Sequence, residues 1–257
     1  MRWDPSQYLR YADLRGRPFV ELTARIGAEN PSYVVDLGCG TGELTATLAE
    51  RWPDATVSGV DSSAEMVATA QQHAIAGRLT FDVADLREWR PERPVDVLTA
   101  NAVLQWVPGH LDLLDDLVRA LAPGGWLAFQ VPDNFEEPSH TLLRDLRLSP
   151  RWRERLGEGA DRTAGVERPA TYLRKLLELG LDADVWQTTY QQVLQGDDAV
   201  LEWVKGTALR PVLSLLTDDA ERDEFLHDYG AALGEAYPRE SFGTVFPFRR
   251  TFVVGRH

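Results

Sequence analysis

Short apolar runs alternate with amphipathic stretches over the first half of the chain. The runs predict strands near residues 33–37, 56–60, 79–83, 95–101 and 125–131. The stretches between them predict helices near residues 17–29, 43–51, 63–76 and 110–121. Ser62 and Glu65 have the spacing of a capping box, and Pro123–Gly125 are typical of a helix stop. Elements that alternate in this way form an α/β fold with a doubly wound, mostly parallel sheet, whose ligands lie at the carboxyl ends of the strands.

The second half has a different pattern. It predicts helices near 139–156, 169–179, 197–207 and 217–236, and strands near 183–193 and 244–255. We interpret the chain as one domain with a helical cap insertion. Its expected parts are an N-terminal lid (1–16), a cofactor-binding core (17–135), a mostly helical cap with the sixth strand (136–240) and the last strand (241–257).

Composition narrows the function classes. The 257 residues carry a formal net charge of −13, which argues against nucleic acid as a partner. No apolar run has the length of a membrane span or a signal peptide, so we expect a cytoplasmic protein without a membrane partner. Cys39 is the single cysteine, which excludes an internal disulfide and any multi-cysteine metal site. No metal-ligand cluster is visible, so no metal is expected, and the oligomeric state stays open.

The stretch Val34–Gly42 is the most informative motif. A buried β-branched run is followed by glycines at positions 38, 40 and 42 and then by a helix, which predicts a nucleotide-like ligand at the helix N-terminus. The dinucleotide fingerprint needs a third glycine where this chain has Glu43. That mismatch counts against a nicotinamide cofactor.

Three acids lie at the ends of three successive predicted strands. Asp61 can accept hydrogen bonds from both hydroxyls of a ribose, and Asp85 can accept one from an adenine amino group. Asp36 can face a positively charged amino group. No lysine lies nearby to offset these charges, so the acids indicate a ligand with a cationic end and no phosphates.

These residues resemble the motifs of class I S-adenosylmethionine-dependent methyltransferases. Asn101, together with Leu121–Gly125, is similar to that family's later motifs. The resemblance implies a Rossmann-like, seven-stranded sheet and S-adenosylmethionine as the methyl donor. It places the methionine part near Gly38 and Asn101, the ribose on Asp61 and the adenine beside Asp85 and Leu86. The cofactor-binding residues implied are Asp36, Gly38, Gly40, Gly42, Asp61, Ser62, Asp85, Leu86 and Asn101.

Further segments resemble the trans-aconitate 2-methyltransferases over nearly the whole chain. They are Trp3–Leu9, Asn101–Trp106, Pro132–Asn134 and Trp186–Tyr190. The likeness implies methyl transfer to one carboxylate of trans-aconitate, a small anionic polycarboxylate, giving a monomethyl ester and S-adenosylhomocysteine. Which carboxylate is esterified stays open.

A carboxylate acceptor is ionised at neutral pH and needs no general base, which agrees with the absence of a catalytic acid–base arrangement in the sequence. We expect Gln105 and Trp106 to position the reacting groups. We prefer Arg250 to Arg249 because it shares a strand face with Phe248 and Phe252. The substrate-binding candidates are Trp3, Tyr8, Trp106, His140, Arg144, Tyr190 and Arg250.

Several alternatives stay open. The acceptor could be another small-molecule or carrier-bound carboxylate, or a phenol or amine with His140 as the base. Other classes are a nicotinamide dehydrogenase and a non-catalytic cofactor-binding protein. Arg144 suits a solvated helix face about as well as a binding site, and Trp3 and Tyr8 could simply pack the N-terminus.

Overall fold

The computed structural model describes residues 12–157 and 165–257, with side chains from residue 16 onward in the first range. The chain forms two compact units. The first comprises residues up to Val131, Val166–Thr188 and Thr251–His257, and the second comprises Pro132–Gly165 and Thr189–Arg250. Residues Trp3 and Tyr8, predicted to bind substrate, lie outside the described residues.

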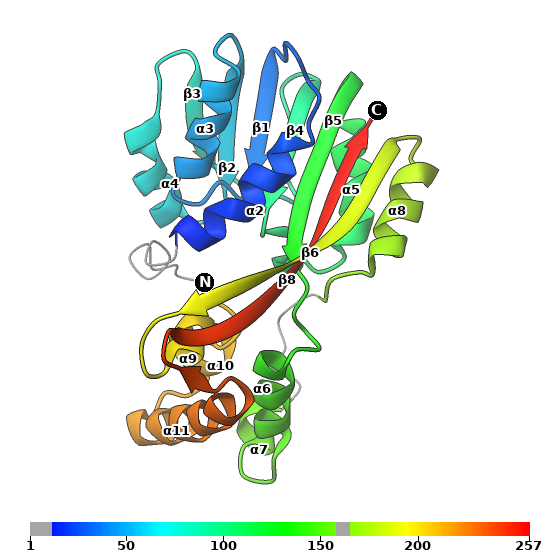
Figure 1. Ribbon diagram of the computed structural model, residues 1–257. Coiled ribbons are helices and arrows are strands. Elements are labelled where there is room, and N and C mark those ends of the chain that lie inside the picture. The colour runs from blue at the N-terminus through cyan, green and yellow to red at the C-terminus, as the bar shows by residue number, and fades with distance from the viewer. Residues whose placement is uncertain (1–11, 158–164) are drawn as a thin grey trace. The chain divides into compact units, whose positions relative to one another are not determined.

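One sheet forms the centre of the first unit, and its strands β6 and β8 continue into the second unit. Its strand order is β3-β2-β1-β4-β5-β8-β6, and the short β7 pairs with β8 in antiparallel orientation. The pairs β1–β2, β2–β3, β1–β4 and β4–β5 are parallel, which confirms the doubly wound α/β fold. The strands are β1 (Tyr33–Leu37), β2 (Thr56–Asp61), β3 (Leu79–Val83), β4 (Val95–Asn101), β5 (Leu121–Pro132), β6 (Asp182–Leu194), β7 (Arg239–Glu240) and β8 (Gly243–Arg256) (Figure 1).

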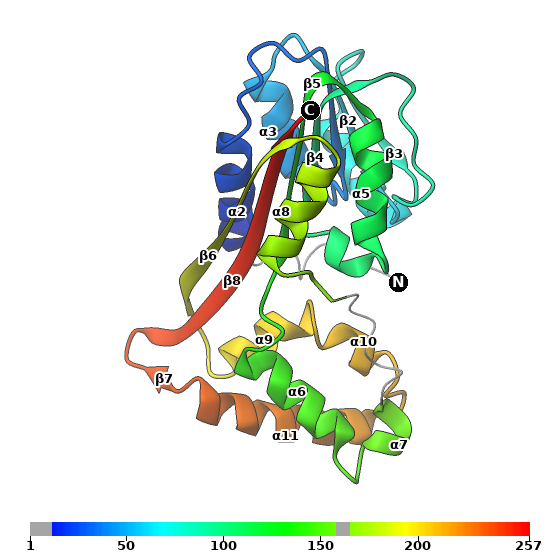
Figure 2. The same ribbon diagram turned by 90° about the vertical axis from the view of Figure 1, so that its right-hand side faces the viewer.

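Helices cover both faces of this sheet. The helices α2 and α3 lie on one face, and α5 and α8 lie on the other (Figure 2). Val35, Leu98 and Phe129 join leucines of α5 in a continuous apolar core. Side chains alternate along each strand, so Asp36 and Thr99 point to the opposite face. The helices of this unit are α2 (Ala12–Ala24), α3 (Glu43–Arg51), α4 (Ala64–Ala70), α5 (His110–Arg119) and α8 (Pro169–Glu178).

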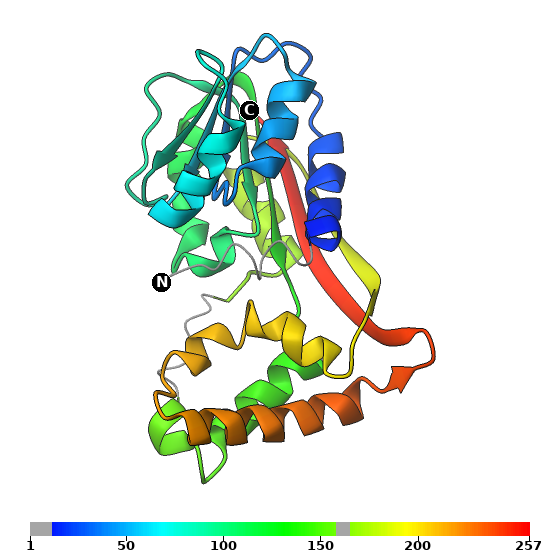
Figure 3. The same ribbon diagram turned by 90° about the vertical axis from the view of Figure 1, so that its left-hand side faces the viewer.

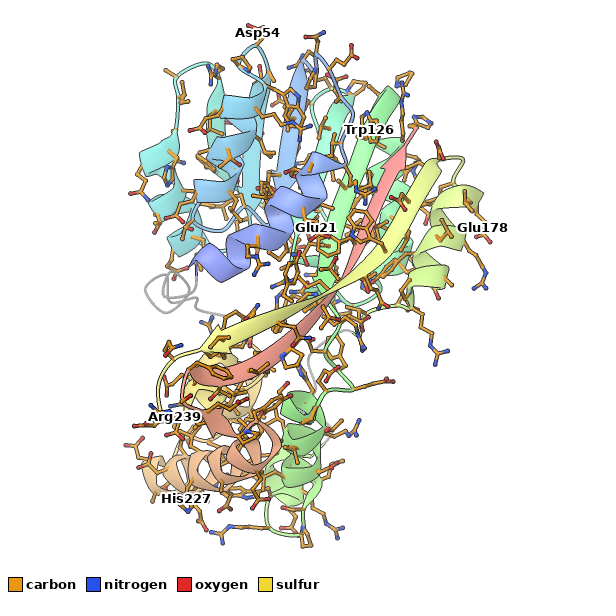
Figure 4. The ribbon with its side chains drawn as sticks, viewed as in Figure 1. Glu21, Asp54, Trp126, Glu178, His227 and Arg239 are labelled. Atoms are coloured by element: carbon orange, nitrogen blue, oxygen red, sulfur yellow. The ribbon has the colours of Figure 1, made fainter. Side chains whose placement is uncertain are left out.

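The Trp186–Tyr190 segment contributes to this packing. Glu21 of α2 accepts hydrogen bonds from Trp186 Nε1 at 3.0 Å and from Thr188 Oγ1 at 2.6 Å (Figure 4). The Trp186 ring stacks on Phe252 with centroids 5.0 Å apart. These two residues of the segment therefore tie β6 to α2 and β8.

Three boundaries of α4 and α5 differ from the prediction. The cap of α4 is Ser63 rather than Ser62, because the Ser63 hydroxyl accepts a hydrogen bond from the Met66 amide. The helix also ends at Ala70, before a short 3₁₀ turn. The stop assigned to Pro123–Gly125 is wrong as well: α5 ends at Arg119, and that segment lies inside β5.

The second unit is mostly helical. Its helices are α6 (Pro138–Leu148), α7 (Arg153–Leu156), α9 (Ala199–Lys205), α10 (Arg210–Leu213) and α11 (Asp219–Ala236). The single helix predicted over 139–156 is thus two helices. The long α11 runs beside α6 (Figure 3), and Tyr229 of α11 donates a hydrogen bond to the Ser139 carbonyl. Asp218 caps α11 by accepting from the Glu221 amide at 3.0 Å.

Among the residues that the structure describes, no helix combines the length and apolar character needed to cross a membrane.

Candidate active site

The glycine loop connects β1 to α3, and its three glycines have different surroundings. All three have left-handed backbones, with φ of 74° at Gly38, 55° at Gly40 and 82° at Gly42. A Cβ on Gly38 would lie 2.6 Å from Val103, and one on Gly42 would lie 2.8 Å from Ala70. A Cβ on Gly40 would meet nothing within 4 Å. Gly38 and Gly42 therefore serve close packing within the protein, whereas Gly40 marks the open side of the loop.

Asp61 holds this loop against the end of β2. Its Oδ2 accepts a hydrogen bond from the Gly40 amide at 2.9 Å, and its Oδ1 accepts one from the Ser63 amide at 2.9 Å. The carboxylate thereby joins the glycine loop to the start of α4. It also lies directly beside the open position at Gly40, where a ribose is predicted. Ser62, between the two, is exposed.

Asp36 lies inside the protein rather than at the surface of the site. Its Oδ2 accepts from the Thr45 hydroxyl at 2.6 Å, and its Oδ1 accepts from the Thr99 hydroxyl at 2.7 Å. Burial raises the pKa of Asp36 to about 6, although the two hydroxyl hydrogen bonds oppose that shift. The carboxyl group thus connects β1 to α3 and to β4 beneath the glycine loop. The same burial, with Asp36 and Asp61 nearby, raises the pKa of Cys39, so its side chain stays a thiol.

Asp85 and Leu86 follow β3. Asp85 Oδ1 accepts from the backbone and side chain of Arg87 at 2.9 and 3.0 Å, and Oδ2 accepts from Arg87 Nη2 at 2.6 Å. These hydrogen bonds lower the pKa of Asp85 to about 2. Leu86 is buried in the core of the sheet. Arg87 therefore determines how the Asp85 carboxylate is oriented.

Asn101 ends β4, and the turn that follows it packs against the glycine loop. Asn101 Oδ1 accepts a hydrogen bond from Gln130 Nε2 at 2.7 Å. Ala102 has a left-handed backbone with φ of 55°, which is uncommon for a residue other than glycine. Its amide donates to the Gln130 carbonyl, and its carbonyl accepts from Gln105 Nε2 at 2.6 Å. The next residue, Val103, packs against Gly38.

Gln105 and Trp106 lie in the 3₁₀ turn η2 (Leu104–Trp106) of the same unit. Gln105 is buried, and its side-chain amino group donates a hydrogen bond to the Ala102 carbonyl. The Gln105 side chain therefore supports the turn after β4. Trp106 is partly exposed.

The second unit contains the remaining substrate-binding candidates. Arg250 is only 5% exposed, and its guanidinium lies 4.8 Å from the centroid of the Phe248 ring. Arg249 is instead surrounded by acids: its Nε donates to the Asp133 carbonyl at 3.0 Å, and its guanidinium lies 3.6 Å from the Asp133 carboxylate and 3.8 Å from Glu137. The two arginines thus have different environments, as the alternation of strand faces predicts.

The other candidates of this unit vary in exposure. Tyr190 is buried. His140 Nδ1 lies 3.2 Å from the Ser139 hydroxyl, and its ring packs edge-on against Phe135. Arg144 Nε lies 3.7 Å from Asp145, and both side chains are more than half exposed.

Comparison with known proteins identifies the family. Residues 34–125 match a family described as methyltransferase domain. The trans-aconitate 2-methyltransferase of Streptomyces avermitilis is 53% identical to this chain, over 98% of this chain and 96% of that protein. The trans-aconitate 2-methyltransferase of Rhodococcus jostii is 49% identical, over 99% of both. The chain belongs to the trans-aconitate 2-methyltransferase family. It is therefore a methyltransferase, and the dehydrogenase and non-catalytic alternatives are excluded.

Solved structures agree on the fold. Phosphoethanolamine N-methyltransferase 2 of Haemonchus contortus, in complex with S-adenosyl-L-methionine, matches with a TM-score of 0.55 and 17% identity. The match covers 93% of this chain and 52% of that one. The complex of the Haloferax volcanii Trm112 activator with a methyltransferase matches with a TM-score of 0.56 and 20% identity, over 98% and 94%. At this identity the likeness shows the methyltransferase fold.

Some residues that shape the site in this family member were not predicted. Thr45 and Thr99 bind Asp36 through contacts that no local motif predicts, whereas Arg87 binds Asp85 from only two residues away. Gln130 had a signal: it is a polar residue inside the apolar run Leu127–Val131 of a predicted buried strand. Such a residue needs a partner, and the partner is Asn101.

Proposed function

We propose that this chain transfers a methyl group from S-adenosylmethionine to one carboxylate of trans-aconitate, giving a monomethyl ester and S-adenosylhomocysteine. The observation that carries the proposal is identity of about half of all residues, over nearly the full length, to trans-aconitate 2-methyltransferases. The glycine loop, open at Gly40 and held by Asp61, supports binding of the donor at this place.

The donor site consists of groups that suit a ligand without phosphates. Gly40 would allow close approach of the ligand to the backbone, and Asp61 would accept from the ribose hydroxyls. Asp85 and Leu86 would border the adenine, and Asn101 the methionine end. The bound donor supplies a methyl group on a sulfonium centre. Asp36, buried beneath the glycine loop, would stabilise the cationic end of the donor by its negative charge and would hold the loop in place.

The proposed reaction needs alignment more than acid–base chemistry. A carboxylate acceptor is already ionised at neutral pH, so the protein has no proton to remove. What remains is to hold the acceptor in line with the methyl group and to exclude water. We assign Trp106 to shaping the methyl site. Gln105 would act through the Ala102 turn that carries Asn101.

Acceptor binding is assigned to the second unit. Arg250 is the leading candidate, because a buried guanidinium stacked on a ring can bind a carboxylate through two parallel hydrogen bonds. Tyr190, His140 and Arg144 remain candidates, as do Trp3 and Tyr8 outside the described residues. Arg249 is a poorer choice, since Asp133 and Glu137 already surround it.

The proposal is tested by incubating the purified protein with methyl-labelled S-adenosylmethionine and a panel of acids. The panel contains trans-aconitate, cis-aconitate, citrate, isocitrate and an acyl chain that ends in a carboxylate on a carrier. We expect the highest kcat/KM with trans-aconitate, and NMR of the ester identifies the methylated carboxylate. Turnover of another acid without turnover of trans-aconitate would refute the proposed acceptor.

A further inference from the structure

Asn101 and Gln130 are directly opposite one another on the parallel strands β4 and β5. Gln130 is completely buried, whereas Asn101 is partly exposed. The bond between them runs from Gln130 Nε2 to Asn101 Oδ1, at 2.7 Å. A carboxamide oxygen only accepts hydrogen bonds and its nitrogen only donates them. The direction of this one bond therefore decides which end of the Asn101 carboxamide faces away from Gln130.

The backbone around Asn101 is held in place, so the orientation of its terminal amide is the main freedom that the side chain keeps. Asn101 is the last residue of β4, and Ala102 follows in the left-handed conformation. The Gln130 carbonyl accepts from the Ala102 amide at 3.0 Å, and Gln105 holds the Ala102 carbonyl. The turn is thus held on both sides. Rotation of the terminal amide of Asn101 by half a turn would exchange its oxygen and nitrogen with little change in shape.

We propose that Gln130 is a positioning residue that turns the amino group of Asn101 toward the bound ligands, so that Asn101 recognises a carboxylate. This inference rests on the proposed function, because it assumes that Asn101 borders the donor. The carboxylate is either the one at the methionine end of the donor or the one that accepts the methyl group. Both have the same chemistry, and the experiment distinguishes them.

The charges around the site agree with this polarity. The negative charge assigned to the ammonium group comes from β1, as Asp36, whereas Asp61 at the end of β2 is assigned to the ribose. Asn101, on β4, contributes a neutral donor instead. The amino-acid end of the donor carries both an ammonium and a carboxylate group, so the carboxylate of Asp36 and the amide donor of Asn101 match its two charged groups. The reverse orientation of Asn101 would place a carbonyl oxygen against a carboxylate, at the cost of a hydrogen bond to a charged group.

Asn101→Asp tests the polarity directly. It replaces the amino group by an oxygen at nearly constant shape, and Gln130 can still donate to the other oxygen. We expect about 10- to 100-fold weaker binding or a KM raised by that factor, since a charge-assisted hydrogen bond is lost and a repulsion gained. If the Asn101 oxygen instead accepted a hydrogen bond from an ammonium group, Asn101→Asp would bind S-adenosylhomocysteine as tightly as the wild type or more tightly.

Gln130→Glu tests the positioning role. An ionised glutamate at this position can only accept, so it would pull the amino group of Asn101 inward and present the oxygen to the ligand. A protonated one can donate and restores the original orientation. We expect near wild-type behaviour at pH 5.5 and a loss of about tenfold or more at pH 8. Asp36, the titratable group in contact with Thr99 on this face, is present in both proteins, so the ratio to wild type at each pH removes its effect.

One matched variant completes the series. Gln130→Met keeps the volume of the side chain but cannot donate, so we expect a loss at both pH values. A merely structural role of Gln130 would lower the melting temperature of the Gln130→Glu variant without a pH-dependent ratio. Asn101 is partly exposed, so Asn101→Asp keeps the test available if a substitution at Gln130 prevents folding.

The measurements are calorimetric binding of S-adenosylhomocysteine and of 5′-methylthioadenosine, which lacks the amino-acid end, together with the KM of trans-aconitate. Weaker binding of the first compound but not of the second assigns the contact to the methionine carboxylate. Unchanged binding of both with a raised KM assigns it to the acceptor. The inference is overturned if Asn101→Asp and Gln130→Glu both leave affinity and KM within twofold of wild type. A wild-type protein that binds neither compound overturns the proposed function instead.

Discussion

The buried carboxyl group of Asp36 makes a sharp prediction about stability. Its two oxygens accept from Thr45 and Thr99, and burial raises its pKa to about 6 from the ordinary 3.8. The folded protein therefore binds this proton more tightly than the unfolded chain does, so the ionised form costs stability at neutral pH. At about 1.4 kcal/mol per pH unit, the difference between the two pKa values corresponds to about 3 kcal/mol.

Asp36→Asn removes this cost while keeping the shape of the side chain. One threonine hydroxyl can still donate to the amide oxygen. The other can accept from the amide nitrogen, since the Thr99 hydroxyl has a second acceptor in the Val35 carbonyl at 3.3 Å. We expect the variant to be more stable than wild type at pH 7.5, by up to about 3 kcal/mol, and to bind S-adenosylhomocysteine more weakly because a negative charge is lost.

Urea denaturation of both proteins at pH 7.5, 5.5 and 4.5 measures this effect. Protonation of Asp36 stabilises the folded wild type as the pH falls through its pKa, so its free energy of unfolding should rise relative to the variant. The linkage relation gives about 0.8 kcal/mol at pH 5.5 and about 2 kcal/mol at pH 4.5, relative to pH 7.5. A difference between the proteins that stays constant with pH, or changes in the opposite direction, would refute the assignment of a desolvated carboxyl group.

Asp96, at the start of β4, offers a control of opposite sign. Burial alone would raise its pKa, but hydrogen bonds from the Ser32 hydroxyl and from the amides of Ser32 and Tyr33 lower it below its ordinary value. Its contribution to stability is present above the unfolded pKa and is lost as the pH falls through the folded one. Asp96→Asn should therefore destabilise the protein at pH 7.5, and the difference should shrink toward low pH.

Three further predictions concern the loop and the ligands. Gly38→Ala should lower the melting temperature more than Gly40→Ala, because the new Cβ clashes with Val103 only at Gly38. Gly40→Ala adds about 1 kcal/mol of backbone strain without a clash, and it should weaken binding of S-adenosylhomocysteine, as calorimetry measures. Equal melting temperatures would contradict the difference in packing. Asp85→Asn should weaken that binding several-fold and change the free energy of unfolding by under about 1 kcal/mol, because its ion pair is exposed. Arg250→Lys should raise the KM of trans-aconitate about tenfold or more and leave the affinity for the donor unchanged. The control Arg249→Lys should leave that KM within about threefold of wild type. A larger effect of Arg249→Lys than of Arg250→Lys would exclude Arg250 as the residue that binds the carboxylate.

Local patterns were enough to predict the framework of the first unit. The strands at 33–37, 79–83 and 95–101 match the structure residue for residue. The strands β1 and β4 are buried on both faces and largely apolar, whereas the edge strand β3 buries only Leu79 and Phe81. The glycine loop was equally clear, since its left-handed backbone positions can be occupied without strain only by glycine. Element ends were less accurate. The N-cap of α4 is Ser63 instead of the predicted Ser62. Asp61 accepts a hydrogen bond from the Ser63 amide, and the Ser63 hydroxyl accepts one from the Met66 amide.

The chemistry of individual side chains depended on tertiary contacts. Asp36, Asp61 and Asp85 look alike in the sequence, as acids near strand ends. In the structure, Asp36 is buried on threonine hydroxyls, Asp61 joins two backbone segments, and Asp85 is held by an arginine. Burial raises the pKa of Asp36, whereas hydrogen bonds from Arg87, two residues further along the chain, lower the pKa of Asp85.

The sequence by itself therefore determined the sheet and the place of the glycine loop, because these follow from apolar periodicity and from glycine spacing within short segments, and its motifs gave the resemblance to the family. Only the tertiary structure decided the state of Asp36 and the orientation of Asn101. Both depend on residues brought beside them by parallel strand pairing, Thr99 in the first case and Gln130 in the second. A hydrogen bond has a direction, and that direction exists only once both partners are in place.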